Sequence, residues 1–192
     1  MRSRPSLLLL LAFGLAPISF TTSGCRPVPA PETAVVERTD VDGLLRLIEQ
    51  RLALMDDVAR WKWNESQPVT DPKREQELLE KVVERGQGRG LDPELVRSFF
   101  AAQMEAARSI QQADFERWTA QKQKPFADAT SLTGLRQRID AINDQLIDAL
   151  VQVTPRLKTA SMQQELRRRS QEILKAPGMA EVRDKVIAPL MK

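Results

Sequence analysis

The sequence predicts an all-α helical bundle in a single domain, with about four main helices and two weaker helices near the C-terminus. Apolar residues recur with helical periodicity along nearly the whole chain after residue 40, and no segment shows the alternation typical of a strand or hairpin. The composition agrees, because 29% of the residues are charged, only 5% are aromatic and tyrosine is absent. Such a composition favours amphipathic helices over a β-sandwich.

Residues 1–24 have the pattern of an export signal, and we do not expect them to be part of the fold. Arg2 and Arg4 form a basic start, an apolar segment covers residues 7–20, and small residues follow it. The apolar segment is shorter than the ~20 residues that a membrane-spanning helix needs, and Pro17 interrupts it. The sequence therefore predicts an exported, periplasmic protein.

Cys25, the only cysteine, directly follows this signal, where a bacterial lipoprotein signal places its lipidated residue. Thr22 stands where such signals usually carry leucine, so lipidation of Cys25 and ordinary cleavage both stay open. The proline-rich residues 25–38 are predicted to form a tether. A single cysteine excludes an internal disulfide, and contact with a membrane is expected only through a lipid on Cys25.

Removal of residues 1–24 takes away two arginines and no acidic residue, which leaves a net charge of about +1. We therefore do not predict a nucleic-acid partner. Gly86, Gly88 and Gly90 follow no strand, so they do not indicate a nucleotide-binding loop. Nothing in the sequence indicates a metal or another cofactor.

The first two helices have different kinds of boundary. The first is predicted from an N-cap at Asp40 to about Trp63, on the recurrence of apolar residues. The second is opened by Asp71-Pro72, with proline at the first helical position, and is closed by the glycines at 86–90.

The remaining helices follow similar signals. Asp92-Pro93 repeats the start signal for a third helix, and Thr133 is predicted to cap a fourth helix that ends before Pro155. Two weaker helices are expected over about residues 161–175 and 179–190, because Pro177-Gly178 separates two short amphipathic segments.

A set of polar residues falls at helix-compatible spacings: Arg51, Lys62, Asp71, Arg74, Glu75, Gln111 and Arg136. Four cations, two carboxylates and an amide suit a dianionic ligand. The chain has no histidine, which argues against a hydrolase that relays protons. Taken singly, each of these residues is better explained as a solvated surface charge, and Asp71 also serves as an N-cap, so spacing alone leaves the function open.

The chain carries, in this order, Arg51, Lys62, Pro68, the run Asp71-Pro72-Lys73-Arg74-Glu75, residues 91–93, Gln111 and residues 135–140. This order and spacing resemble the core signature of the all-α (AroQ-type) chorismate mutases over about residues 40–150. Residues 135–140 come late and follow an export signal, which is similar to the exported γ subclass, where one chain completes its own site. The resemblance implies a chorismate mutase domain over residues 39–192 and a homodimer.

The resemblance also implies a reaction and a division of roles. Chorismate, a dicarboxylate, would rearrange to prephenate by an intramolecular Claisen step without a cofactor or covalent intermediate. Arg51 and Arg136 would hold the two carboxylates, and Lys62 and the Gln111 amide would face the ether oxygen.

Glu75 and Asp71 would receive the ring hydroxyl, and Arg74 would balance their charge. The chain departs from the family pattern at Ala107, where the family commonly has a serine or threonine hydroxyl. We therefore expect Ala107 to line the substrate site without donating a hydrogen bond.

A non-enzymatic exported protein is the alternative, either a helical lipoprotein or a periplasmic helical chaperone. It would account for the signal, the tether and the amphipathic helices equally well. It would not account for the spacing of Arg51, Lys62, Arg74 and Arg136.

Overall fold

The computed structural model describes residues 32–191, and the regular structure in this part of the chain is entirely helical. The predicted signal over residues 1–24, Cys25 and the start of the tether lie outside the described residues. The main helices are α1 (Glu32–Asn64), α2 (Pro72–Gly88), α3 (Pro93–Gln121), α4 (Leu132–Val153), α5 (Ala160–Ile173) and α6 (Met179–Ile187). Short 3₁₀ helices cover Thr154–Arg156 and Ala188–Met191. The all-α fold, with four long helices and two shorter ones, is confirmed.

Helix α1 begins at Glu32, so the prediction of an N-cap at Asp40 was wrong. Neither proline nor glycine lies between Pro31 and Gly43, so nothing interrupts the helix until Pro31 is reached. Residues 32–38, which we expected in the tether, are therefore helical. Asp40 instead pairs with Arg156, which follows α4.

The Asp-Pro signals of α2 and α3 are confirmed. The Asp71 carboxylate accepts a hydrogen bond from the Arg74 N–H at 3.1 Å, and the Asp92 carboxylate accepts one from Glu94 N–H at the same distance. Helix α2 ends at Gly88, and Gly90 adopts a φ of +81°, which glycine tolerates best. Local chemistry thus sets both ends of α2.

The N-cap of α4 is Ser131, and the prediction of Thr133 was wrong by two positions. Ser131 has extended backbone angles, and its Oγ accepts from the Gly134 N–H at 3.3 Å. Thr133 already lies inside the helix, where its backbone cannot take the extended cap conformation.

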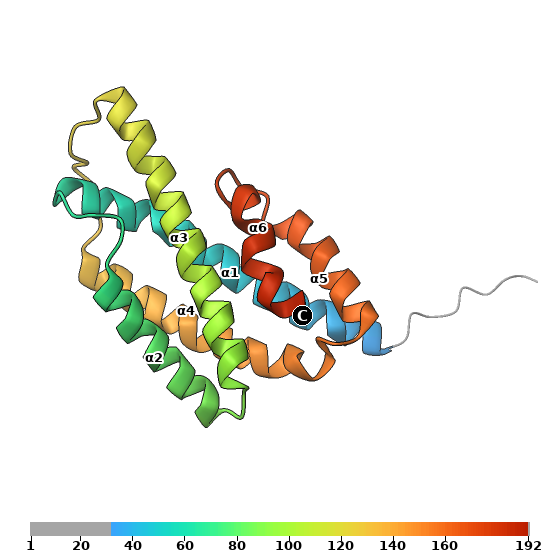
Figure 1. Ribbon diagram of the computed structural model, residues 1–192. Helices are drawn as coiled ribbons and strands as arrows, with labels where there is room; N and C mark the ends of the chain where they lie inside the picture. The colour runs from blue at the N-terminus through green and yellow to red at the C-terminus, as the bar shows by residue number, and fades with distance from the viewer. Residues whose placement is uncertain (1–31, 192) are drawn as a thin grey trace, which may run out of the picture. The chain divides into compact units, whose positions relative to one another are not determined.

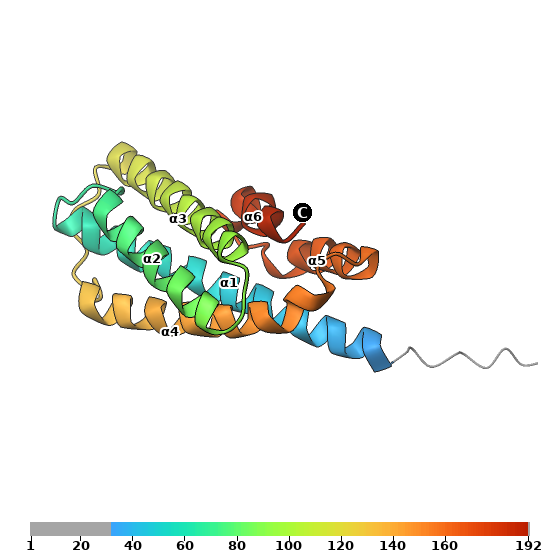
Figure 2. The ribbon, with the colours of Figure 1, turned by 60° about the horizontal axis from the view of Figure 1, so that its bottom comes forward.

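The long helices α1 and α4 lie side by side in opposite directions (Figures 1 and 2). Helix α3 packs on α1, and α2 packs on both α3 and α4. Helix α2 approaches α3 closely at Gly86, where a Cβ atom would come within 2.7 Å of the Val96 side chain. This close approach favours glycine at position 86 and brings α2 against α3.

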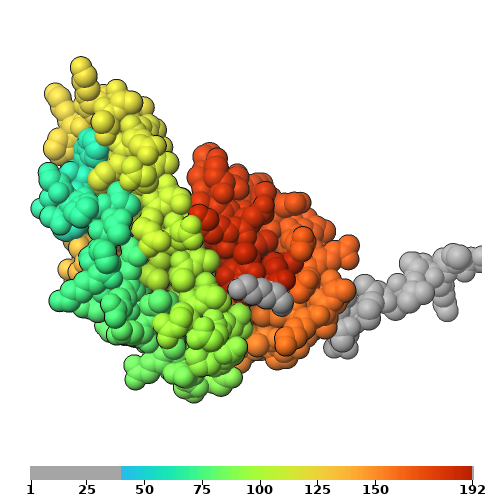
Figure 3. Space-filling model, viewed as in Figure 1, coloured from blue at the N-terminus to red at the C-terminus, as the bar shows by residue number. Residues whose placement is uncertain are grey.

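The C-terminal helices complete the main core. Helix α5 packs on α1, and α6 packs on α3. The space-filling view shows α6 against α3 (Figure 3). Leu166 of α5 and Val186 of α6 are buried in the same apolar cluster as Leu44 and Phe99. A second, smaller cluster consists of Leu54, Met55, Val58, Ala107 and Leu135. Within residues 32–191, no helix combines the length and apolarity needed to cross a membrane.

Candidate active site

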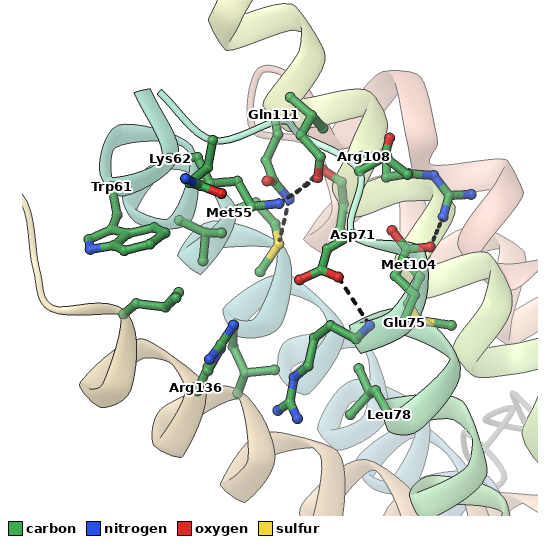
Figure 4. A pocket seen from close by; sticks show the side chains of 18 of the residues that line it. Met55, Trp61, Lys62, Asp71, Glu75, Leu78, Met104, Arg108, Gln111 and Arg136 are labelled. Carbon is green, nitrogen blue, oxygen red and sulfur yellow. Dashed lines mark hydrogen bonds and ion pairs between the residues drawn. The ribbon is translucent and has the colours of Figure 1, made fainter. Parts of the chain in front are cut away.

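A cavity of about 440 Å³ opens between α1, α2, α3 and α4, and the segment that joins α1 to α2 forms part of its wall (Figure 4). All eight residues singled out in the sequence line it: Arg51, Lys62, Asp71, Arg74, Glu75, Ala107, Gln111 and Arg136. One chain therefore brings together residues that are as many as 85 positions apart, Arg51 to Arg136.

The lining has an excess of positive charge. It contains five cationic and three acidic side chains, because Arg108 and Asp140 join the residues expected from the sequence. The excess of two positive charges matches a dianion. An anionic ligand that displaced water here would be favoured, because charges in a partly dehydrated site are weakly screened.

Arg51 is the most buried charge in the cavity, with 2% of its surface exposed. Its Nε donates to Asn143 Oδ1 at 3.0 Å, and one terminal nitrogen donates to the Gln103 carbonyl at 3.3 Å. Burial lowers the pKa of Arg51 to about 10. In the described part of the chain, no carboxylate lies within the 4.0 Å of an ion pair, so this cation lacks a negative partner.

Lys62 lies near the C-terminal end of α1, and its Nζ donates to the carbonyl of Val69. Burial lowers the pKa of the Lys62 ammonium, Asp71 and Glu75 oppose that effect, and Arg136 adds to it. Arg136 is exposed near the start of α4 and has no ion-pair partner among residues 40–191. Lys62 and Arg136 are thus both available to an anion.

The start of α2 presents a mixed set of charges. Asp71 caps the helix through the Arg74 N–H, and its carboxylate lies near the middle of the cavity in Figure 4. The Arg74 guanidinium is 3.9 Å from Glu77 and 4.0 Å from Asp140, which are distances of weak ion pairs. Arg74 can therefore turn toward a ligand at little cost.

Glu75 pairs with Arg108 of α3, a residue that our sequence analysis did not select. Helical spacing offered one signal, since Arg108 lies three residues before Gln111 and hence on the same side of α3. The ion pair joins two helices, so the spacing of residues within either helix does not predict it.

Gln111 is buried, with 4% of its surface exposed. Its Nε2 donates to the Ala107 carbonyl at 3.2 Å and lies 3.6 Å from the Met55 sulfur. Its Oε1 is buried without a partner in the described part of the chain. Ala107, one turn earlier, contributes only a methyl group to the wall.

Within the described residues, no group of three or more His, Cys, Asp or Glu side chains is arranged to hold a metal ion. The polar groups of the cavity include five cationic side chains, three carboxylates and the amide of Gln111. Such a set can bind carboxylates through charge-assisted hydrogen bonds.

Comparisons with known proteins agree with this geometry. The family model described as chorismate mutase type II matches residues 39–112. The monofunctional chorismate mutase of Enterobacter agglomerans is 30% identical over 148 residues, which cover 76% of this chain and 78% of that protein. The secreted chorismate mutase of Mycolicibacterium smegmatis is 26% identical over 155 residues, which cover 81% of this chain and 86% of that protein.

The fold has a close counterpart among solved structures. The crystal structure of chorismate mutase from Burkholderia thailandensis has a TM-score of 0.71 and 29% sequence identity, and the match covers 79% of this chain and 99% of that one. Sequence relationship and fold lead to one conclusion: the chain belongs to the all-α, type II family of chorismate mutases.

Proposed function

We propose that the protein is a chorismate mutase, an isomerase that rearranges chorismate to prephenate without a cofactor. The observation that carries this proposal is the cavity with an excess of two positive charges, in which the buried Arg51 has no carboxylate partner among the described residues. Chorismate bears two carboxylates and would neutralise that excess. A non-enzymatic helical lipoprotein or chaperone is not favoured, since neither would require a buried, unpaired arginine.

The reaction needs neither a nucleophile nor an obligate acid or base, because it is an intramolecular pericyclic step. The enzyme must hold the substrate in its compact, reactive conformer and stabilise the negative charge that develops on the ether oxygen. A rate enhancement of about 10⁶-fold would correspond to about 8 kcal/mol of barrier lowering. Preorganised cations in a partly dehydrated cavity can supply such a stabilisation.

Arg51 and Arg136 would bind the two carboxylates. Arg51 is held rigidly by Asn143 and Gln103, and Arg136 approaches from α4. The planar guanidinium group can form two parallel hydrogen bonds with a carboxylate, which a lysine ammonium cannot reproduce.

Lys62 and Gln111 would act on the ether oxygen. The lowered pKa of Lys62 reflects an ammonium that has already lost part of its hydration, and such a group interacts more strongly with developing charge. The 3.6 Å contact between Gln111 Nε2 and the Met55 sulfur is weak, so one amide hydrogen can turn to the ligand.

Asp71 and Glu75 would accept the ring hydroxyl, with Arg74 balancing their charge. Ala107 provides no hydroxyl, so a ligand hydrogen bond is either absent at this position or made by water. We expect this difference to weaken binding more than turnover.

The direct test is whether the purified protein, residues 25–192, consumes chorismate, followed by the loss of its ultraviolet absorbance and the appearance of prephenate. Arg51→Ala and Lys62→Ala should each lower kcat/KM by about 10²-fold or more. Arg46→Ala is the matched control, because Arg46 lies exposed on α1 outside the cavity. Absence of conversion would reject the proposed activity, and full activity in both cavity variants would reject the proposed site.

We also propose export to the periplasm, with Cys25 as the site of a lipid anchor, and a homodimer. Export is supported by the relatives named secreted chorismate mutase, and the lipid anchor by the position of Cys25 after the signal pattern. Labelling of cells with an alkyne fatty acid, with Cys25→Ser as the control, tests the anchor. Light scattering of the purified protein tests the dimer.

A further inference from the structure

Arg108 of α3 forms an ion pair with Glu75 of α2 along one wall of the cavity (Figure 4). Both side chains line the cavity and both are partly buried, with 36% of Arg108 and 26% of Glu75 exposed. The pair therefore joins two helices beside the space that a ligand would occupy.

The alternative acidic partner of Arg108 is already engaged. Glu105 lies one turn earlier on α3, and its carboxylate accepts a hydrogen bond from Lys185 of α6 at 2.6 Å. Arg108 therefore forms its ion pair with Glu75. Arg108 donates to Oε2 of Glu75, whereas Oε1 of Glu75 has no hydrogen-bond partner in the described part of the chain. One oxygen of Glu75 is held and the other is available to a ligand.

Other cations in the cavity compete for Glu75. The charge of Lys62 interacts with it, and Arg74 directly precedes it on α2. A flexible glutamate among several cations would populate several rotamers, and fixing it on one partner removes that freedom before the ligand arrives. Arg108 also raises the number of cations in the lining from four to five, against three acids.

We propose that Arg108 is a positioning residue for hydroxyl recognition: it fixes the ionised Glu75 carboxylate so that the free oxygen accepts a hydrogen bond from the ring hydroxyl of the substrate. The inference rests on the proposed function, because it assigns the hydroxyl of chorismate to Glu75. Arg108 acts through Glu75 and makes no contact with the reacting atoms in this scheme.

The test uses two stable bicyclic ether dicarboxylates, one with the ring hydroxyl and one without it, as competitive inhibitors of chorismate turnover. The ratio of their inhibition constants measures hydroxyl recognition separately from charge attraction, because both carry the same charge. The variants are Arg108→Met, Arg108→Lys and Glu75→Gln. Arg97→Met is the matched control, since Arg97 lies on the same helix outside the cavity and, among the described residues, also pairs with a glutamate.

In the wild type and in Arg97→Met, we expect the hydroxylated inhibitor to bind about tenfold more tightly, or better. Arg108→Met should reduce this ratio to about threefold or less, Glu75→Gln should do the same, and Arg108→Lys should retain most of it. A structural role alone would change melting temperature and both inhibition constants together, but not their ratio.

A wild-type ratio near one, or a ratio in Arg108→Met equal to that of the wild type, would overturn the inference while the proposed function stands. Complete loss of the ratio in Arg108→Lys would likewise overturn it, because the lysine keeps the positive charge. If the wild type neither converts chorismate nor binds either inhibitor, the proposed function fails and the inference fails with it.

Discussion

Arg51 of α1 and Asn143 of α4 form a buried hydrogen bond of 3.0 Å between residues 92 positions apart in the sequence. Asn143 is fully buried and neutral, so it orients the Arg51 guanidinium without neutralising it. Among the described residues no carboxylate neutralises this cation, and in the proposed site it binds a carboxylate of the ligand. A buried charge without a counter-charge lowers the stability of the fold, and in return the site can bind an anion more strongly.

Replacement of Arg51 by methionine should abolish most activity without lowering stability. Burial lowers the pKa of Arg51 to about 10, so the charged form destabilises the folded protein at neutral pH, by about 3 kcal/mol. Because the folded-state pKa is the lower one, this destabilisation is present below about pH 10 and is lost as the pH rises beyond it toward the higher pKa of the unfolded chain. In Arg51→Met we expect kcat/KM to fall by about 10²-fold or more and the melting temperature to stay equal or rise. A melting temperature about 5 °C or more below the wild type would contradict this account.

Asn143→Leu should affect both stability and binding. The leucine has a similar size but leaves the Arg51 Nε without its acceptor, which should cost about 1–3 kcal/mol and lower the melting temperature by several degrees. The loosened guanidinium should raise KM more than it lowers kcat. Asn143→Asp is the control, because it keeps the acceptor oxygen and should be at least as stable as the wild type. Equal melting temperatures for the Asn143→Leu variant and the wild type would argue against the role of this bond.

The alkaline limb of the pH profile should depend on Lys62. Its ammonium is charged below its pKa, and burial places that pKa below the ordinary 10.5. We therefore expect kcat/KM to decline as the pH rises through this lowered pKa. Lys62→Arg keeps a cation that stays charged, so the limb should move to higher pH even if the rate is reduced. If the alkaline decline of kcat/KM occurs at the same pH in the wild type and in Lys62→Arg, the titrating group is not Lys62.

Gln111→Glu should move the pH optimum to acid. A carboxyl group at this buried position must be protonated to donate a hydrogen bond to the ether oxygen, whereas the amide donates at any pH. The profile of kcat/KM between pH 4 and pH 9, measured on both proteins, checks this expectation. Gln112→Glu, at the exposed neighbouring position, should leave the profile unchanged. An unaltered profile in Gln111→Glu would remove Gln111 from the ether-oxygen role.

Ala107→Ser should tighten binding. The methyl group of Ala107 lines the cavity, and the added hydroxyl could donate to the ligand without a large change in volume. We expect KM to fall by a few-fold with little change in kcat. Ser109→Ala serves as a comparison, because Ser109 lies on the exposed side of α3. A KM that is unchanged or higher in Ala107→Ser would show that the missing hydroxyl is not a deficit in this site.

The start of a helix could be predicted from the sequence where a few neighbouring residues determine it. Asp71-Pro72 and Asp92-Pro93 each combine a capping carboxylate with a proline at the first helical position, and both starts were correct. The starts of α1 and α4 were wrong, at Asp40 and Thr133. Aspartate and threonine are common both at caps and inside first turns, so residue type alone did not decide between neighbouring positions.

The sequence by itself determined the all-α class, the amphipathic faces and the residues able to bind a dianion, because these depend on residue types and on the period of the helix. The tertiary structure decided which of them meet. The bond from Arg51 to Asn143 and the pair of Arg108 with Glu75 each join two different helices. Such contacts depend on how far each helix is rotated and displaced against its neighbour, and helical periodicity carries no information about either quantity.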